Sequence, residues 1–328
     1  MTAIATAQSC ANIAFVKYWG RRDDALRLPL NASISMNLDA ATTITTVAFD
    51  PALADDVVTI HGAEDGGKAA RRVSEHLDRI RALAGISTRA RVASRNSFPM
   101  GAGIASSASA FAALTAAACA AAGLDLDERA LSILARQGSG SACRSIPAGF
   151  VEWHAGDTSA ESFAESIAPP GHWDLRDLIA IVQTAHKTVG SSKGNALVST
   201  SPFAAARLAE AERALPVIRR AILARDFAAF GTETEQEAIR MHAVAMTSRP
   251  SLLYWSPETV RLMHAIRAWR DEGLPAWFTI DAGANVHVLC EGPHADAIEA
   301  RLRAEPGVLD VIANRPGPGT RLIADHLF

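Results

Sequence analysis

The chain has 328 residues, of which 49% are hydrophobic and 20% charged. This composition is typical of a globular protein and excludes a disordered chain, and the length allows one large domain or two closely packed ones. Lys and Arg number 32 against 35 Asp and Glu, which gives a formal net charge of −3. That balance excludes the basic surface of a general nucleic-acid binder, although a few local cations are enough to bind a small anion.

The cysteines and the N-terminal segment indicate the compartment. Cys10, Cys119, Cys143 and Cys290 are far apart and form no CxxC pair. This spacing argues against structural zinc and favours a reducing, cytoplasmic environment. The first residues lack the positive start and apolar run of a secretion signal, so no processing is expected.

One uncharged stretch, residues 96–124, is long enough to span a bilayer. Most of its residues are Ala, Ser, Thr, Gly and Pro, which gain little free energy on leaving water. We therefore expect a tightly packed buried helix here and no membrane span.

The first half of the chain mixes strand and helix patterns. Residues 68–84 carry apolar side chains at helical spacing and are followed by Gly85, which predicts a helix with a C-terminal stop. Alternating or β-rich stretches predict strands, and the remaining segments predict two helices and their loops. The other elements expected here are strands over 13–19, 33–47, 89–98, 150–155 and 178–185, a loop over 21–29, a helix ending at Gly123, a helix over 127–137 and a loop over 138–142.

The second half is mostly helical. Amphipathic helix is expected over about 202–272, interrupted at Pro216, followed by strand, turn and strand over 276–290. A helix over 294–304 and a strand pair near 307–324 complete the pattern. The predicted fold class is α+β, with an N-terminal domain over residues 1–185 and a helix-rich C-terminal domain over 186–328.

Residues 99–110, PMGAGIASSASA, follow a strand and open a helix. Small residues let the backbone approach an anion, and the unpaired N–H groups of a helix start carry partial positive charge. Ser106 and Ser107 add hydroxyl donors. The segment is neither a Walker A loop nor a GxGxxG fingerprint. Taken alone, it fits a triphosphate-binding loop and a serine-capped helix equally well.

The same segment resembles the phosphate loop of the small-metabolite GHMP kinase superfamily, which includes galactokinase, homoserine kinase and mevalonate kinase. Four further segments resemble the mevalonate diphosphate decarboxylase family, in the family's order and over nearly the whole chain. They are NIAFVKYWGRRD at 12–23, LPLNASISMNL at 28–38, GSGSACRSIPAGFVEW at 138–153 and FTIDAGANVHVL at 278–289. The resemblance implies a GHMP-kinase-like two-lobed fold, with a ribosomal-S5-like N-terminal half, a ferredoxin-like C-terminal half and a cleft between them.

The implied reaction uses ATP and Mg²⁺ to phosphorylate the tertiary 3-hydroxyl of a 5-phosphorylated mevalonate, after which phosphate and CO2 leave and an alkene forms. Asp281, which follows a strand and precedes a glycine, would orient the alcohol and accept its proton. Lys17 would keep that acid ionised, and Arg144 would hold the substrate carboxylate through its planar fork. Each has a plainer explanation: a turn-forming Asp, a solvent-facing strand Lys, and an Arg that braces its own loop.

The remaining candidates follow from the same motifs. The loop assigns ATP binding to Pro99, Gly101, Ala102, Gly103, Ala105, Ser106 and Ser107. Substrate binding is expected of Asn12, Tyr18, Arg21, Ser139, Gly140, Ser141, Ser191 and Ser192. Tyr18 fits a core position as well, and the serines fit a loop without a ligand. No protein metal site is expected, and the family resemblance implies a homodimer.

Two departures from the family pattern fall where it binds the substrate's 5-phosphates. The first motif usually reads KYWGKRD, whereas this chain has Arg21 in place of the second lysine. In a later segment the family commonly has Gly-Met where this chain has Gly194 and Asn195. This chain also lacks an arginine that some bacterial members have in that segment. A longer Arg21 would fill the space of one phosphate and bind the other bidentately. The sequence thus favours (R)-5-phosphomevalonate, giving isopentenyl phosphate, over the 5-diphosphate.

Three rival functions explain less of the chain. A mevalonate 3-kinase would phosphorylate without losing CO2, and the combination of Asp281, Lys17 and Arg144 argues against it. A non-catalytic binding protein of the same fold would not need Asp281. A different small-molecule kinase, such as a homoserine kinase, would explain the 99–110 loop but not the segments around Arg21 and Arg144.

Overall fold

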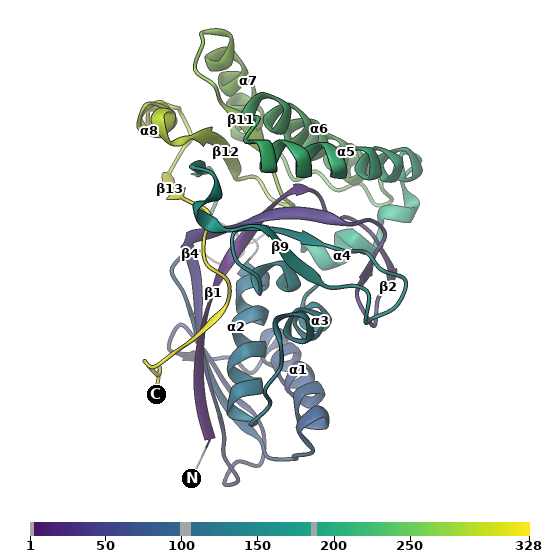
Figure 1. Ribbon diagram of the computed structural model, residues 1–328, viewed down its shortest axis with the longest axis vertical. Helices are drawn as coiled ribbons and strands as arrows, with labels where there is room; N and C mark the ends of the chain where they lie inside the picture. Colours follow the sequence, from purple (N-terminus) through teal and green to yellow (C-terminus); the bar gives the residue numbers. More distant parts are fainter. Residues whose placement is uncertain (1–2, 99–105, 185–188) are drawn as a thin grey trace.

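The computed structural model describes residues 3–98, 106–184 and 189–328. Its larger sheet has eight strands, with β14-β1-β4-β7-β5-β6 in order, β8 pairing with β4, and β9 pairing with β8 (Figure 1). All its pairings are antiparallel except that of β5 with β7. The strands are β1 (Ala3–Val16), β4 (Ser33–Phe49), β5 (Val57–Ile60), β6 (Ala63–Glu64), β7 (Ala90–Asn96), β8 (Phe150–Trp153), β9 (Ala164–Ala168) and β14 (Arg321–Ile323).

The smaller sheet has four antiparallel strands in the order β11-β12-β10-β13. A separate hairpin pairs two short strands that follow β1. The bounds are β10 (Leu175–Ile181), β11 (Trp277–Thr279), β12 (Val286–Glu291) and β13 (Asp310–Asn314), with β2 (Arg21–Asp23) and β3 (Leu28–Pro29) in the hairpin.

The helices form two groups. In Figure 1, α1, α2 and α3 lie beside the larger sheet, and α6, α7 and α8 lie with the smaller one, while α5 lies beside α6 and packs against β1, β4 and β9 of the larger sheet. The bounds are α1 (Lys68–Ala84), α2 (Ser106–Ala121), α3 (Glu128–Gly138), α4 (Ser191–Ala196), α5 (Ala204–Ala224), α6 (Phe227–Thr247), α7 (Pro257–Asp271) and α8 (Ala295–Ala304), with 3₁₀ turns η1 (Gly140–Ser145), η2 (Pro170–His172), η3 (Val198–Thr200) and η4 (Gly292–His294).

The helix predicted over residues 68–84 is confirmed at both ends. Helix α1 buries Leu77 and Ile80, and Gly85 ends it with φ 67°, in the left-handed region that favours glycine. The Ala-rich helix α2 is also confirmed as a buried helix, because its small side chains let it pack closely on β1 and β4. Within the described residues, no helix has both the length and the apolar character needed to cross a bilayer.

Several expectations differ from the structure. Residues 21–29, expected as a loop, form the β2–β3 hairpin. Strand β1 begins at Ala3 and ends at Val16, because it pairs with β4 along its length, so residues 17–19 follow the strand. Helix α5 continues through Pro216, because packing of both flanks outweighs the local cost of a proline. The predicted 178–185 strand is β10, which begins and ends earlier. The last two strands do not pair with each other: β13 pairs with β10 and β14 with β1.

The α+β class is confirmed, and the two sheets cross the predicted domain boundary in both directions. Strand β10 precedes residue 185 but belongs to the smaller sheet. Strand β14 comes from the second half but returns to the edge of the larger one. The boundary at residue 185 stays a prediction. Segments of both halves thus contribute to each sheet.

Candidate active site

A cavity between the two halves gathers most of the residues that the sequence singled out. From the first half it is lined by Lys17, Tyr18, Arg21, Ser106, Ser107, Ser139, Gly140, Ser141 and Arg144, and from the second by Ser191, Ser192 and Asp281. These residues come from segments far apart in the chain, so their convergence on one cavity is independent support for the grouping made from sequence.

The Lys17–Asp281 ion pair joins the halves. Lys17 follows β1, and Asp281 lies in the turn between β11 and β12. Lys17 Nζ is 2.6 Å from Asp281 Oδ1, and the lysine side chain is 1% exposed against 23% for the aspartate. The carboxylate is therefore the member of the pair that meets the solvent in the cavity.

Charge and burial oppose each other in this pair. Burial favours the neutral acid, but the charge and hydrogen bond of Lys17, with a smaller effect of Arg144, hold the pKa of Asp281 below its usual range. Burial lowers the pKa of Lys17, and Asp281 counters that effect. Asp281 is thus a carboxylate at neutral pH, ready to accept a hydrogen bond from an alcohol.

Arg144 lies in η1, and two buried side chains accept hydrogen bonds from its guanidinium. Its Nε donates to Asn12 Oδ1 at 3.2 Å and its Nη1 to Ser33 Oγ at 2.8 Å. These two bonds fix the plane of a guanidinium that lines the cavity while being 3% exposed. A fixed planar donor with this placement suits a carboxylate ligand.

Asn12 was expected to contact substrate, but the structure places it behind Arg144. It is 1% exposed and donates to Ser145 Oγ at 2.8 Å and to the Ser141 carbonyl at 3.1 Å. It is absent from the described residues that line the cavity. Its amide therefore orients Arg144 and the η1 turn.

Arg21 connects two parts of the cavity wall. Its Nε donates to Tyr18 Oη at 2.7 Å and its Nη2 to Ser192 Oγ at 3.0 Å, while Nη1 pairs with the exposed Asp24 at 2.9 Å. Tyr18 also packs on Trp153, with ring centroids 4.6 Å apart. The group Tyr18, Arg21 and Ser192, here called the Arg21 cluster, spans from the first motif to α4.

Two glycines allow aromatic side chains to pack closely against the backbone around the cavity. A Cβ at Gly140 would lie 2.6 Å from Tyr18 Oη, and one at Gly194 would lie 2.5 Å from the Trp19 ring. Asn195, the other departure from the family pattern, accepts a hydrogen bond from the Gly20 N–H at 2.8 Å and so ties α4 to the first motif.

The expected ATP loop is only partly within the described residues. Pro99, Gly101, Ala102, Gly103 and Ala105 lie outside them. Ser106 and Ser107 begin α2 and line the cavity, and Ser139 Oγ lies 3.3 Å from Ser107 Oγ. The start of a 16-residue helix with two hydroxyls fits the phosphates of a nucleotide.

Several cavity residues were missed by the sequence reasoning. Lys68 and Arg72, one turn apart on α1, and Arg27, from the hairpin, add positive charge to the wall. Burial, with the neighbouring Arg21 and Arg72, lowers the pKa of Arg27 to about 10. The spacing of Lys68 and Arg72 at i and i+4 was the available signal, since it puts two cations on one helix face. The described residues contain no group of three or more His, Cys, Asp or Glu placed to hold a metal ion.

Two family models together match most of the chain. A family model described as the diphosphomevalonate decarboxylase-like N-terminal domain matches residues 9–164. A second, the mevalonate 5-diphosphate decarboxylase C-terminal domain, matches residues 177–307.

Similar proteins cover nearly the whole chain. A phosphomevalonate decarboxylase of Haloferax volcanii is 34% identical over 96% of each chain. A diphosphomevalonate decarboxylase of Ganoderma lucidum is 37% identical over 90% of this chain and 80% of its own length.

Solved structures confirm the GHMP-kinase-like fold. One, described as MDDEF in complex with MVAPP, AMPPCP and magnesium, superposes with a TM-score of 0.93 at 37% identity, covering 99% of this chain and 100% of that one. Mevalonate diphosphate decarboxylase from Staphylococcus aureus gives 0.93 at 36% identity, with 99% of each chain covered. The cavity, both domain matches and these superpositions lead to one conclusion: the chain belongs to the mevalonate diphosphate decarboxylase family, whose members are ATP-dependent decarboxylases of phosphorylated mevalonate.

Proposed function

We propose that this chain decarboxylates (R)-5-phosphomevalonate with ATP and Mg²⁺, giving isopentenyl phosphate, ADP, phosphate and CO2. The observation that carries the choice of the monophosphate is the Arg21 cluster. The Arg21 guanidinium occupies the space between Tyr18 Oη and Ser192 Oγ, at 2.7 and 3.0 Å, where a shorter lysine would leave room. An arginine there presents two donors to one phosphate and takes up the volume of a second.

In the first step of the proposed reaction, the 3-hydroxyl of the substrate attacks the γ-phosphorus of ATP and ADP leaves. The Asp281 carboxylate accepts the hydroxyl hydrogen bond and then the proton, and the Lys17 ammonium stabilises charge on the transferring group. Ser106 and Ser107 would bind the ATP phosphates at the start of α2. Bound Mg²⁺ would neutralise part of the phosphate charge.

In the second step the C3–O bond breaks and phosphate leaves with the bonding electrons. The C1–C2 bond then breaks, its electrons form the C2–C3 double bond, and C1 departs as CO2. Arg144 would hold the carboxylate in line for this cleavage, since Asn12 and Ser33 fix the plane of its guanidinium. Positive charge developing at C3 would be stabilised by the electrons of the breaking bond, so no electron-sink cofactor is needed.

A second candidate substrate is (R)-5-diphosphomevalonate. Its support is the additional positive charge of Arg27 and Arg72 on the cavity wall. The diphosphomevalonate decarboxylases named among the similar proteins are consistent with it. More cations than one phosphate requires would favour the larger anion.

The two candidates are separated by measuring ADP and CO2 release in parallel with mevalonate, its 5-phosphate and its 5-diphosphate. We expect the highest kcat/KM with the 5-phosphate and equal amounts of ADP and CO2. A higher kcat/KM with the 5-diphosphate would assign the chain to the second candidate. ADP release without CO2 would instead assign it to the 3-kinases.

We further propose that the chain acts as a homodimer, as the family resemblance implies, and that it does so in the cytoplasm, as its cysteines indicate. Sedimentation equilibrium should give twice the mass of 34.6 kDa, and a monomer mass would contradict the proposed assembly. Cell fractionation of a tagged chain tests the compartment.

A further inference from the structure

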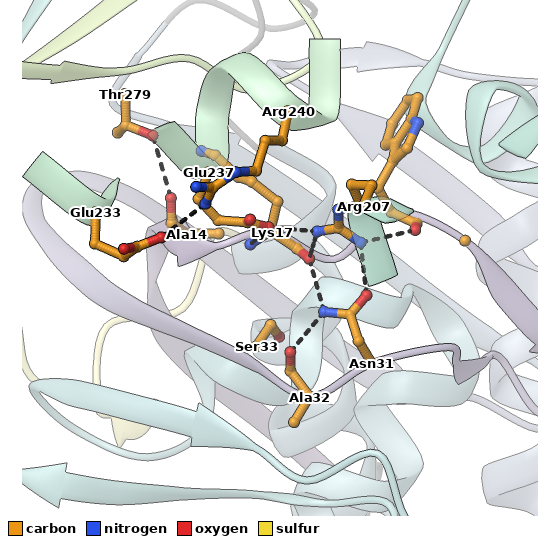
Figure 2. A network of polar contacts seen from close by, with 12 residues as sticks. Ala14, Lys17, Asn31, Ala32, Ser33, Arg207, Glu233, Glu237, Arg240 and Thr279 are labelled. Carbon is orange, nitrogen blue, oxygen red and sulfur yellow. Dashed lines mark hydrogen bonds and ion pairs between the residues drawn. The ribbon is translucent and has the colours of Figure 1, made fainter. Parts of the chain in front are cut away.

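A second buried ion pair lies directly behind Lys17. Arg207 of α5 and Glu237 of α6 are in contact at 2.7 Å, with side chains 2% and 0% exposed (Figure 2). Neither lines the cavity among the described residues. The pair belongs to the helical part of the second half, whereas Lys17 belongs to the first.

The pair binds the backbone of Lys17 on both sides. Arg207 Nη2 donates to the Lys17 carbonyl at 2.5 Å, and the Lys17 N–H donates to Glu237 Oε1 at 3.4 Å. Asn31 Nδ2 donates to the same carbonyl at 3.1 Å, and Arg207 Nη1 donates to Asn31 Oδ1 at 2.7 Å (Figure 2).

These contacts replace hydrogen bonds that a strand would supply. Strand β1 ends at Val16, so the peptide groups of Lys17 lie beyond the sheet pairing. A lysine side chain has four rotatable bonds, so the position of its ammonium depends on where its backbone is held. Its partner Asp281 comes from another sheet, so the 2.6 Å contact requires both backbones to be fixed.

The ion pair of Arg207 and Glu237 contributes little to the free energy of unfolding by itself. Removing two charges from water costs more than their attraction returns unless every remaining polar atom is bound. Arg207 Nε and Glu237 Oε2 are buried and have no hydrogen-bond partner among the residues that the structure describes. The contacts that are made converge on Lys17, Trp19 and Asn31, that is, on the first motif and its neighbour.

We propose that Arg207 and Glu237 are positioning residues for the reaction: their ion pair fixes the peptide of Lys17 and thereby the placement of its ammonium against Asp281. The inference rests on the proposed function, since it assigns the pair a role through Lys17 and Asp281. It adds two residues, on helices outside the recognised motifs, to the machinery of phosphoryl transfer.

The first experiment compares Arg207→Met with Arg81→Met. Arg81, in the last turn of α1, is the matched control because it pairs with Asp56 at 3.0 Å, with side chains 5% and 2% exposed, and does not line the cavity. Both variants should unfold at lower denaturant concentration. Only Arg207→Met should lower kcat, by about 10- to 100-fold for a misplacement near 1 Å, while the nucleotide Kd stays within twofold. Equal kcat in the two folded variants would overturn the proposal.

The double variant Arg207→Met/Glu237→Met separates positioning from folding. Removing both charges should restore much of the stability that a single change loses. A positioning role predicts that kcat stays low in this stable protein, and recovery of kcat with stability would contradict it. If the methionine variants do not fold, Glu237→Gln keeps the size and the oxygen acceptor, and should lower kcat without changing nucleotide Kd. Wild-type kcat in Glu237→Gln would count against the proposal.

Asp281→Asn, measured in parallel, distinguishes failure of this inference from failure of the proposed function. If Asp281→Asn is inactive while the folded Arg207 and Glu237 variants have wild-type kcat, only the positioning role is wrong. If Asp281→Asn retains wild-type turnover, the proposed catalytic pair itself is wrong.

Discussion

Buried partners hold the Lys17 cluster, defined as Lys17, Asp281 and Arg144. In the Arg21 cluster, two of the three side chains that Arg21 contacts are exposed. Lys17 and Arg144 are 1% and 3% exposed, and Asn12, Ser33, Glu237 and Arg207 support them from the core. Arg21 instead contacts Asp24, whose side chain is 72% exposed, and Ser192, which is also exposed. The difference separates a preorganised reaction centre from an adaptable binding region, so chemistry and substrate choice should respond to different substitutions.

The largest effect is expected for Asp281→Asn. The amide cannot accept a proton from the alcohol, so kcat should fall by about 10²–10⁴-fold, the usual contribution of a positioned general base. Nucleotide Kd, measured with a fluorescent analogue, should stay unchanged. Loss of nucleotide binding would mean that Asp281 has a different role.

Lys17→Met tests the electrostatics of the same cluster. Lys17 lowers the pKa of Asp281, so in the wild type the active carboxylate persists until the pH falls below the ordinary range for Asp. Without the lysine, burial is less opposed and this pKa should rise. The acid limb of the kcat/KM profile should then move to higher pH, along with a lower kcat. An acid limb at the wild-type pH would show that Lys17 does not control this carboxylate.

Arg144→Gln should lower kcat/KM by about 10- to 100-fold, because a charge-assisted hydrogen bond contributes about 1.5–3 kcal/mol. Arg136→Gln is the matched control, since Arg136 is also buried but binds the carbonyls of Leu26 and Ser159 outside the cavity. Both should reduce stability in urea, and only Arg144→Gln should change the kinetics. Similar kinetics in the two variants would remove Arg144 from the site.

The smallest effect belongs to the Arg21 cluster. Arg21→Lys shortens the side chain and removes its fork, so the ratio of kcat/KM for the 5-phosphate to that for the 5-diphosphate should fall by about tenfold, or about 1.4 kcal/mol. Arg22→Lys is the neighbouring control, because Arg22 pairs with the exposed Asp157. An unchanged ratio in Arg21→Lys would remove the reason for preferring the monophosphate.

The sequence predicted local features better than long-range ones. Helix α1 was recognised in full because its apolar spacing and Gly85 are properties of consecutive residues. The partners of β13 and β14 were not recognised, because strand pairing across the chain leaves little trace in one sequence. The continuous α5 was missed at Pro216 for the same reason, since tertiary packing decides whether a proline ends a helix.

The candidate site shows the same limit. Asp281, Lys17 and Arg144 were identified through motifs, and the structure brings all three to one cavity. Arg207 and Glu237 were not identified, because an arginine and a glutamate on amphipathic helices usually face water. Only the fold reveals that they are buried behind Lys17. Asn12 was expected to contact substrate because it lies in the same motif as Lys17. Tertiary packing, which the motif does not reveal, turns its side chain toward Arg144.

A single turnover of (R)-5-phosphomevalonate and ATP, followed on wild-type enzyme and on Asp281→Asn, tests the proposed role of Asp281. We expect the wild type to release one ADP for each CO2, and Asp281→Asn to bind ATP but release neither on the same timescale. Release of CO2 at the wild-type rate by Asp281→Asn, or of ADP without CO2 by the wild type, would contradict this expectation.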